Sequence, residues 1–144
     1  MLKPINIFFI IAIIASRFLP HPPNFTPIIS IFALTSPANV LPLLLVYLGT
    51  DLIIGVHAVM AWVYASLFAI SYFRPGPLTS SIIFFIVTNF GVWTTGWYGF
   101  DIQGLIECYW VALPFFANTL ISTFLFYNLY KFYINFKNYR LFAV

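Results

Sequence analysis

The chain alternates long apolar stretches with short breaks that are rich in proline, glycine and polar residues. The runs PHPPN (20–24) and RPGP (74–77) are the clearest breaks, because proline lacks a backbone N–H and disfavours helical geometry at the preceding residue. The breaks predict six helices, over residues 4–19, 26–36, 38–56, 57–73, 78–95 and 104–130. The second of these is short for a membrane crossing, which takes about 20 helical residues.

The composition places these helices in a lipid bilayer. Of 144 residues, 62% are hydrophobic and 6% are charged, whereas a soluble domain carries about 25% charged residues. So few charges cannot cover a water-facing surface, which excludes a soluble enzyme, a disulfide-stapled secreted module and a disordered tail. The net charge of +3 comes without a basic patch, so we expect no nucleic-acid partner. We expect an all-α integral membrane protein, with residues 1–144 forming a single transmembrane domain in contact with lipid.

The charged residues predict the orientation of a six-helix bundle. With six crossings both chain ends lie on one side, and the positive-inside rule makes that side cytoplasmic. The side is marked by Lys3, Arg74, Lys131, Lys137 and Arg140, and the opposite side by Arg17, Asp51, Asp101 and Glu107. If residues 26–36 were only re-entrant, Arg74 would disagree with the carboxy terminus. The charges therefore favour a crossing by this short segment.

Polar side chains gather in the outer half of the predicted bundle, where their cost in a membrane makes them candidates for function. Asn89, Trp93 and Trp97 recur every four residues and share one helix face. A second face, through Pro114 and Asn118, lies on the last helix. Two such faces beneath a proline-stiffened loop predict a small-molecule pocket. Its candidate residues are Arg17, His21, Asn24, Asp51, His57, Asn89, Trp93 and Asn118.

Each candidate has a functional and a structural interpretation. In a pocket, Trp93 would stack on a ring, Asn89 and Asn118 would fix polar edges, and Arg17 or Asp51 would meet a charged group. Alternatively, Arg17 and Asp51 pair as a structural clamp, and the two asparagines join helices by hydrogen bonds. His57 also fits an interface histidine bonded to a carbonyl, and tryptophans are common at membrane interfaces whatever the function.

Small residues form two stripes that suit close helix packing. Ala61, Ala65 and Ala69 recur every four residues, and Ala12 with Ser16 does the same on the first helix. Such stripes let two backbones approach closely. They predict either packing inside the bundle or a docking face for another membrane subunit.

The chain carries none of the common catalytic or nucleotide-binding motifs. There is no G-x-S-x-G, no H-E-x-x-H, no C-x-x-C and no Gly-rich phosphate loop. We therefore expect that the protein is not an enzyme and that it has no cofactor or metal site. Energised transport would depend on a separate ATPase partner.

Four runs of residues resemble a known family. They are SRFLPHPPNFTPI (16–28), DLIIGVH (51–57), TNFGVW (88–93) and CYWVALPFFANTL (108–120). They resemble an uncharacterised family of small bacterial membrane proteins to which a transport role has been ascribed. That family is in turn similar to the substrate-binding S-components of energy-coupling factor transporters.

The resemblance implies six helices with cytoplasmic termini, in the bacterial cytoplasmic membrane, and a substrate pocket under the first loop. It also implies docking to a transmembrane coupling protein served by ATPase subunits, through small residues such as Ala12 and Ser16. Substrates of S-components are typically vitamins and related micronutrients. Some cobalamin-binding S-components supply a cobalt ligand from a region comparable to His57. The chain departs from its relatives at ALTSPAN (33–39), where they carry a Gly-rich stretch.

These observations predict a membrane-embedded binding subunit for uptake of a vitamin-like micronutrient, energised by a separate ATPase-coupled module. The alternative is a small membrane scaffold or assembly protein in which the polar cluster only holds the helices together.

Overall fold

The computed structural model of the chain describes the backbone of residues 4–142 and the side chains of residues 7–136. Over these residues the chain forms six α-helices and one 3-10 turn. The helices are α1 (Pro4–Phe18), α2 (Ile28–Leu34), α3 (Val40–Ile54), α4 (Met60–Phe73), α5 (Pro77–Thr94) and α6 (Ile102–Phe142), and the turn is η1 (Pro37–Asn39). The predicted all-α class is confirmed.

Three helical segments are long and apolar enough to cross a membrane, namely Pro37–Ile54, Pro77–Thr94 and Ile102–Phe136. Large apolar side chains such as Leu52, Ile53 and Trp110 are exposed on the outside of the molecule, whereas small hydroxyl residues are buried inside it. This arrangement, with large apolar residues outside and small hydroxyl residues inside, suits a lipid environment. Apolar side chains gain no free energy by leaving an apolar solvent, and small residues let the helices pack closely. The structure therefore indicates a multi-pass membrane protein.

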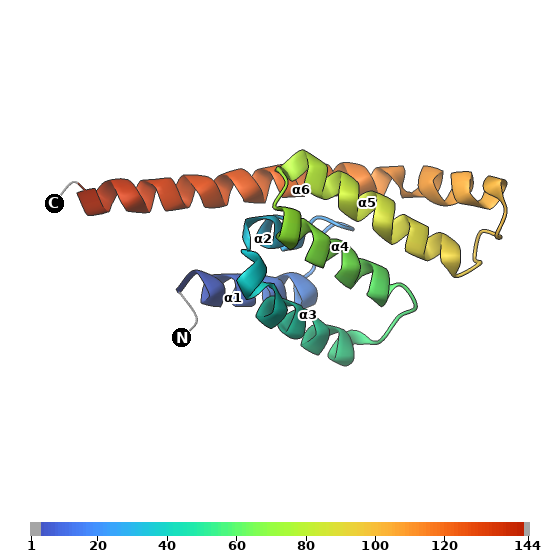
Figure 1. Cartoon of the computed structure of the whole chain (residues 1–144), viewed down its shortest axis with the longest axis horizontal. Helices are drawn as coiled ribbons and strands as arrows, with labels where there is room; N and C mark the ends of the chain where they lie inside the picture. Colours follow the sequence, from blue (N-terminus) through green and yellow to red (C-terminus); the bar gives the residue numbers. More distant parts are fainter. Residues whose placement is uncertain (1–3, 143–144) are drawn as a thin grey trace.

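Successive helices alternate in direction along the long axis of the molecule (Figure 1). The start of α1 and the end of α6 consequently lie at the same end. The α3–α4 and α5–α6 loops lie toward the opposite end. This arrangement matches the alternation predicted from the sequence; which end faces the cytoplasm stays a prediction.

The shortest helix, α2, occupies the centre of the molecule. It spans seven residues, about 10 Å at 1.5 Å per residue, and so covers only a third of a bilayer core. Helix α2 alone is thus shorter than the predicted segment 26–36, and whether that segment crosses the membrane stays a prediction. Pro27 precedes the helix and Pro37 follows it closely, and both limit its length. The chain still reverses direction here, so the alternation survives.

Hydrogen bonds from small side chains tie α2 to its neighbours. The Ser30 hydroxyl donates to the Thr123 carbonyl of α6 at 3.0 Å, and the Ser71 hydroxyl of α4 donates to the Phe32 carbonyl at 2.9 Å. All three polar side chains are buried. α2 is therefore a central, buried helix, and α1, α4, α5 and α6 pack against it.

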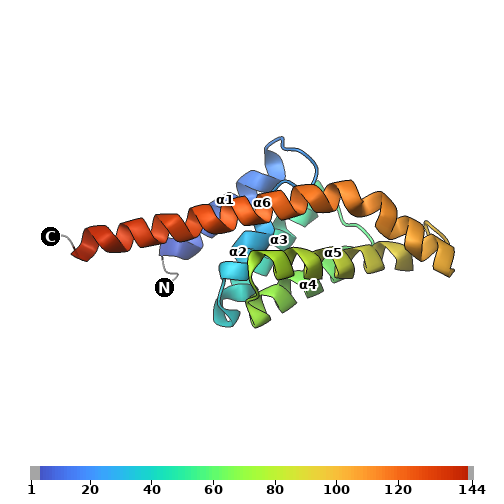
Figure 2. The same cartoon turned by 90° about the horizontal axis from the view of Figure 1, so that it is seen from above.

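The last helix is much longer than predicted. α6 contains 41 residues, about 60 Å in length, and its final part projects alone beyond the bundle (Figure 1). Pro114 lies inside it, and the first half of the helix is bent (Figure 2), as expected where proline removes a backbone hydrogen bond. The predicted end at residue 130 is wrong. The apolar run ends near Lys131, but the residues beyond it continue the helix.

Candidate functional site

A buried ion pair joins the ends of α1 and α3. Arg17 in the last turn of α1 forms a salt bridge with Asp51 in the last turn of α3 through its Nη2 atom. The Asp51 side chain is 1% exposed and the Arg17 side chain 22% exposed. The clamp interpretation of these residues is thus confirmed as a contact. The pair also neutralises the two charges, which a membrane interior requires.

Two tyrosines complete the network around this pair. The Tyr64 hydroxyl of α4 donates to Asp51 Oδ2 at 2.7 Å. Arg17 Nη1 donates to the Tyr47 hydroxyl at 3.5 Å, and the guanidinium carbon lies 4.9 Å from the Tyr47 ring centroid. The two rings meet edge to face, with centroids 5.7 Å apart. Arg17 and Asp51 are therefore held by three helices at once.

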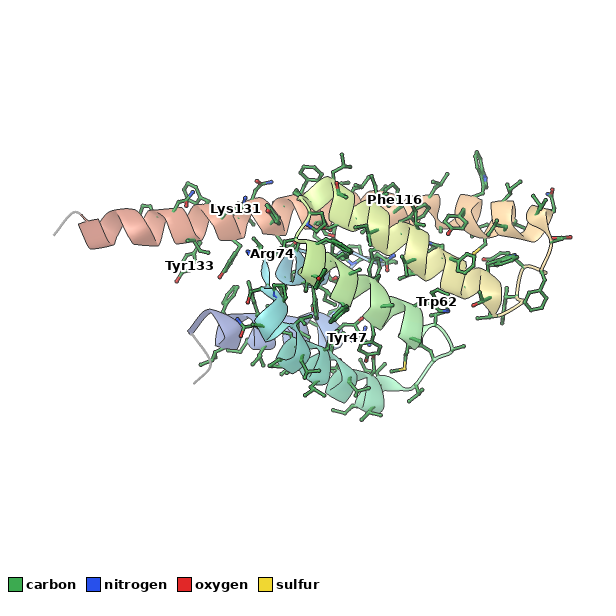
Figure 3. The ribbon with its side chains drawn as sticks, in the orientation of Figure 1. Tyr47, Trp62, Arg74, Phe116, Lys131 and Tyr133 are labelled. Atoms are coloured by element: carbon green, nitrogen blue, oxygen red, sulfur yellow. The ribbon has the colours of Figure 1, made fainter. Side chains whose placement is uncertain are left out.

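Two neighbouring chambers lie next to this network, and residues of the loop over 19–27 line both of them. The larger chamber has a volume of about 270 Å³ and the smaller about 120 Å³. They share Asn24, Tyr47, Phe84 and Thr119 as lining residues. We call the two chambers together the loop cavity. Tyr47 on α3 and Phe116 on α6 reach it from different sides of the molecule (Figure 3).

The lining combines aromatic walls with a few polar groups. Phe84, Phe85, Phe115 and Phe116 surround the larger chamber, and the Phe85 and Phe116 rings stack with centroids 4.4 Å apart. Among the polar atoms, Arg17 Nε is buried without a hydrogen-bond partner in the described part of the chain. Asn89 Nδ2 donates to the Phe85 carbonyl at 2.8 Å, and no described residue donates to its Oδ1. Asn89 Oδ1 is thus an acceptor without a protein partner, whereas Arg17 Nε is an unpaired donor that is buried within the protein.

The loop over residues 19–27 is fastened to α6. Asn118 Nδ2 donates to the Pro23 carbonyl at 3.0 Å, and the Ser122 hydroxyl donates to the Asn24 carbonyl at 3.4 Å. Asn24 itself has a left-handed backbone, with φ of 59°, which asparagine tolerates better than most residues. The ring of Phe25 packs on Phe126 with centroids 6.0 Å apart. Two hydrogen bonds and one ring contact to α6 therefore hold the loop over the cavity.

Of the eight residues predicted for the pocket, four line the loop cavity and two adjoin it. Arg17, His21, Asn24 and Asn89 line the loop cavity. Asp51 does not line it, but it holds Arg17 in place. Asn118 anchors the loop instead of lining a chamber.

Two predicted residues lie elsewhere. His57 is exposed in the α3–α4 loop, because α3 ends at Ile54 and Gly55, with φ of 136°, turns the chain away. Trp93 lies one turn beyond Asn89 on α5 and packs between Phe90 and Phe100, with centroids 5.5 and 6.4 Å away. Trp93 is not among the residues that line the loop cavity, and its neighbours are rings near the α5–α6 turn.

Sequence reasoning missed several lining residues. Tyr47 lies one turn before Asp51 on α3, so the i, i+4 spacing of a helix was a usable signal. Thr88 and Thr119 adjoin Asn89 and Asn118 in sequence and line the larger chamber. Tyr64 had no such signal, since it reaches Asp51 from a different helix.

The small-residue stripes fall on different surfaces. Ala61 and Ala65 are exposed on α4 and Ala69 is half-buried, so no described helix covers the first two. Ala12 lines a groove between α1 and α6, and the Ser16 hydroxyl donates to its own helix at the Ile13 carbonyl, 2.8 Å away. Packing inside the bundle therefore does not account for Ala61 and Ala65.

Metal-binding groups are dispersed within the described residues. No three His, Cys, Asp or Glu side chains among them come together as a metal site. Cys108 is buried and its thiol lies 3.4 Å from the Asn89 carbonyl. The residues that surround the loop cavity are thus suited to hydrogen bonding and ring stacking.

The fold and this cavity define an all-α, multi-pass membrane protein with a loop-covered chamber among its helices. The chain belongs to the family of unknown function DUF6580, whose family model matches residues 3–138. No curated protein and no solved structure matches the chain. The likeness to S-components therefore stays a prediction.

Proposed function

We propose that the protein is a membrane-embedded binding subunit that holds one small, polar, ring-containing molecule in the loop cavity. The observation that supports this proposal is the loop cavity itself, which joins aromatic walls to unpaired hydrogen-bonding atoms beneath a tethered cover. Ligand pockets usually measure about 300–1,000 Å³. Chambers of about 270 and 120 Å³ suit a single ring with short substituents.

The charge balance of the cavity narrows the ligand further. Because Asp51 already neutralises Arg17, the site offers no net charge to a strongly anionic or cationic molecule. Arg17 and Asn89 each keep one polar atom without a partner among the described residues, the buried donor Nε and the acceptor Oδ1. The ligand we expect is a neutral or zwitterionic heteroaromatic molecule with an acceptor on one edge and a donor on another, as in vitamin-like micronutrients.

Transport would require partners. Since the sequence has no nucleotide-binding motif, we propose that uptake is driven by a transmembrane coupling protein and its ATPase subunits. The exposed Ala61 and Ala65 on α4 offer a smooth surface for such a protein. In this proposal the protein works in the bacterial cytoplasmic membrane with its loop cavity toward the outer face.

The scaffold alternative has one specific observation in its favour. Both Asp51 oxygens have partners within the protein, Arg17 and Tyr64. The buried Asp51 carboxylate thus has a structural role that involves no ligand. A scaffold would leave the loop cavity empty in the cell and would act through its outer surfaces.

Native mass spectrometry of the protein, gently extracted from its own membrane, separates the two proposals. The binding-subunit proposal predicts a stoichiometric small molecule on the wild-type protein. Asn89→Ala should lose that molecule, and Asn128→Ala should keep it. Asn128 is a matched control because its Nδ2 also donates to a carbonyl one turn earlier, Phe124, at 2.8 Å, on an exposed surface. A wild-type protein that carries only protein partners and no metabolite would support the scaffold instead.

A further inference from the structure

A second cavity, distinct from the loop cavity, lies where α6 leaves the bundle. Its volume is about 560 Å³, and its walls include Arg74 at the end of α4 and Lys131 on α6. Ser36 and Asn39 line it from the α2–α3 connection, and Tyr130 and Asn135 from α6. We call it the cationic cavity. Arg74 and Lys131 lie near each other, where the projecting part of α6 begins (Figure 3).

The polar groups of the cationic cavity are mainly hydrogen-bond donors. The Tyr130 hydroxyl is buried and has no partner among the described residues. Lys131 Nζ lies 4.7 Å from the Tyr127 ring centroid, and the Arg74 side chain makes no ion pair within residues 7–136. Together with the Ser36 hydroxyl, these groups suit an anion that accepts several hydrogen bonds at once.

The chain has no acidic side chain to spare for these two cations. Its sequence contains three acids. Asp51 pairs with Arg17, Asp101 accepts from the Gly104 backbone N–H at 2.7 Å, and Glu107 is in the second turn of α6 near the opposite end. None of the three lines the cationic cavity. No acidic side chain of the protein therefore competes with an external anion for these two cations.

An apolar groove continues directly from the cationic cavity. The groove has a volume of about 440 Å³ and runs between α1, α2 and α6, with Phe8, Ala12, Phe126 and Leu129 among its walls. It shares Phe9, Leu34 and Tyr130 with the cationic cavity. α1 and α6 meet here through rings, with the Tyr130 centroid 4.9 Å from Phe9 and 6.2 Å from Phe8. These ring contacts join α1 to α6 beside the groove.

We infer that these two spaces form one binding site for an anionic phospholipid, with its phosphate at Arg74 and Lys131 and an acyl chain along the groove. A cationic end joined to an apolar channel matches the two halves of such a lipid. Basic pockets between membrane helices bind anionic headgroups in this way. On the orientation predicted from the charges, this end faces the cytoplasmic leaflet, where anionic lipids attract basic groups. The inference does not rest on the function proposed for the loop cavity.

Lipid retention by the delipidated, detergent-purified protein tests this site. Native mass spectrometry with equal amounts of phosphatidylglycerol and phosphatidylcholine should show at least tenfold preference for phosphatidylglycerol, because two cations favour an anionic headgroup over one whose phosphate is neutralised by choline. The double variant Arg74→Gln, Lys131→Gln should lose that preference. Both side chains are exposed, so the fold should survive. His57→Gln, in the exposed α3–α4 loop toward the opposite end of the molecule, should bind as the wild type does.

Two further measurements distinguish the source of the phosphate. Ala12→Leu, which narrows the groove, should weaken phosphatidylglycerol binding severalfold. Glycerol 3-phosphate, which has the charge but no acyl chain, should not displace the lipid at millimolar concentration. Displacement by glycerol 3-phosphate would show a soluble-phosphate site and overturn the lipid assignment. Equal retention of the two lipids, or wild-type behaviour of the double variant, would overturn the site as a whole.

Discussion

Arg17 on α1 and Asp51 on α3 form an ion pair that is almost sealed from the surroundings, with the Asp51 side chain 1% exposed. The two residues are 34 positions apart in the sequence. Because both lie in the last turn of their helices, the pair aligns the ends of α1 and α3. It also places the Arg17 guanidinium at the wall of the loop cavity. The same contact thus supports the fold and shapes the candidate site.

Breaking this pair from one side should destabilise the protein strongly. Arg17→Gln leaves a buried carboxylate without its counter-charge, which costs about 3–5 kcal/mol. Asp51→Asn should cost less, since Arg17 is partly exposed. The double variant should recover part of the loss, because no unpaired charge remains. Thermal unfolding in detergent measures all three. Additive losses in the double variant would contradict a direct coupling between the residues.

Gly91 on α5 is required by the ring of Trp62 on α4. A Cβ atom at this position would overlap the Trp62 indole and its Cβ. Gly91→Ala should therefore lower the free energy of unfolding by about 1–3 kcal/mol through overpacking. Gly49→Ala is the matched control: nothing lies within 4 Å of a Cβ there, so better helix propensity should leave stability equal or higher. Partial recovery of Gly91→Ala by Trp62→Ala, which removes the indole carbons nearest the new Cβ, would confirm the contact, and no loss in Gly91→Ala would refute it.

The Asn118 side chain should limit the opening of the loop over residues 19–27. Asn118→Ala removes its hydrogen bond to the Pro23 carbonyl, worth about 1 kcal/mol. The amide of Phe25, which donates to the Pro22 carbonyl at 3.0 Å, should then exchange its hydrogen about fivefold faster. Hydrogen-exchange mass spectrometry measures this rate. Asn128→Ala should leave the rate unchanged, and equal acceleration in both variants would point to general loosening of α6.

The orientation of the helices predicts which loops are accessible from outside the cell. In a Cys108→Ser background, His57→Cys in the α3–α4 loop should react with a membrane-impermeant maleimide in intact cells. Ala38→Cys, in the turn before α3, should react only after permeabilisation. Both positions are exposed, so burial does not confound the comparison. Reaction of both cysteines from the same side would overturn the alternating topology predicted from the charges.

The prolines and the apolar runs were sufficient to place most helix boundaries within a few residues. Proline acts on its own residue and the one before it, so the breaks at 20–24 and 74–77 are local properties of the chain. The membrane assignment is equally direct, because it follows from the scarcity of charge. The end of α6 was not accessible in this way. Hydropathy marks where the apolar run ends. A helix can continue past that point, because its backbone hydrogen bonds do not depend on apolar side chains.

In the candidate site, too, the sequence predicted some features and the tertiary structure decided the others. Charge, helical period and the proline break at 20–24 were enough to name Arg17, Asn24 and Asn89, which line the loop cavity. They could not exclude His57 or Trp93, because that depends on where Gly55 turns the chain and on which rings surround Trp93. They also could not join Tyr64 to Asp51, or Tyr130 to a cavity with Arg74. Such contacts arise between helices whose rotation and spacing are decided by packing around the buried α2, and packing is a property of the whole chain.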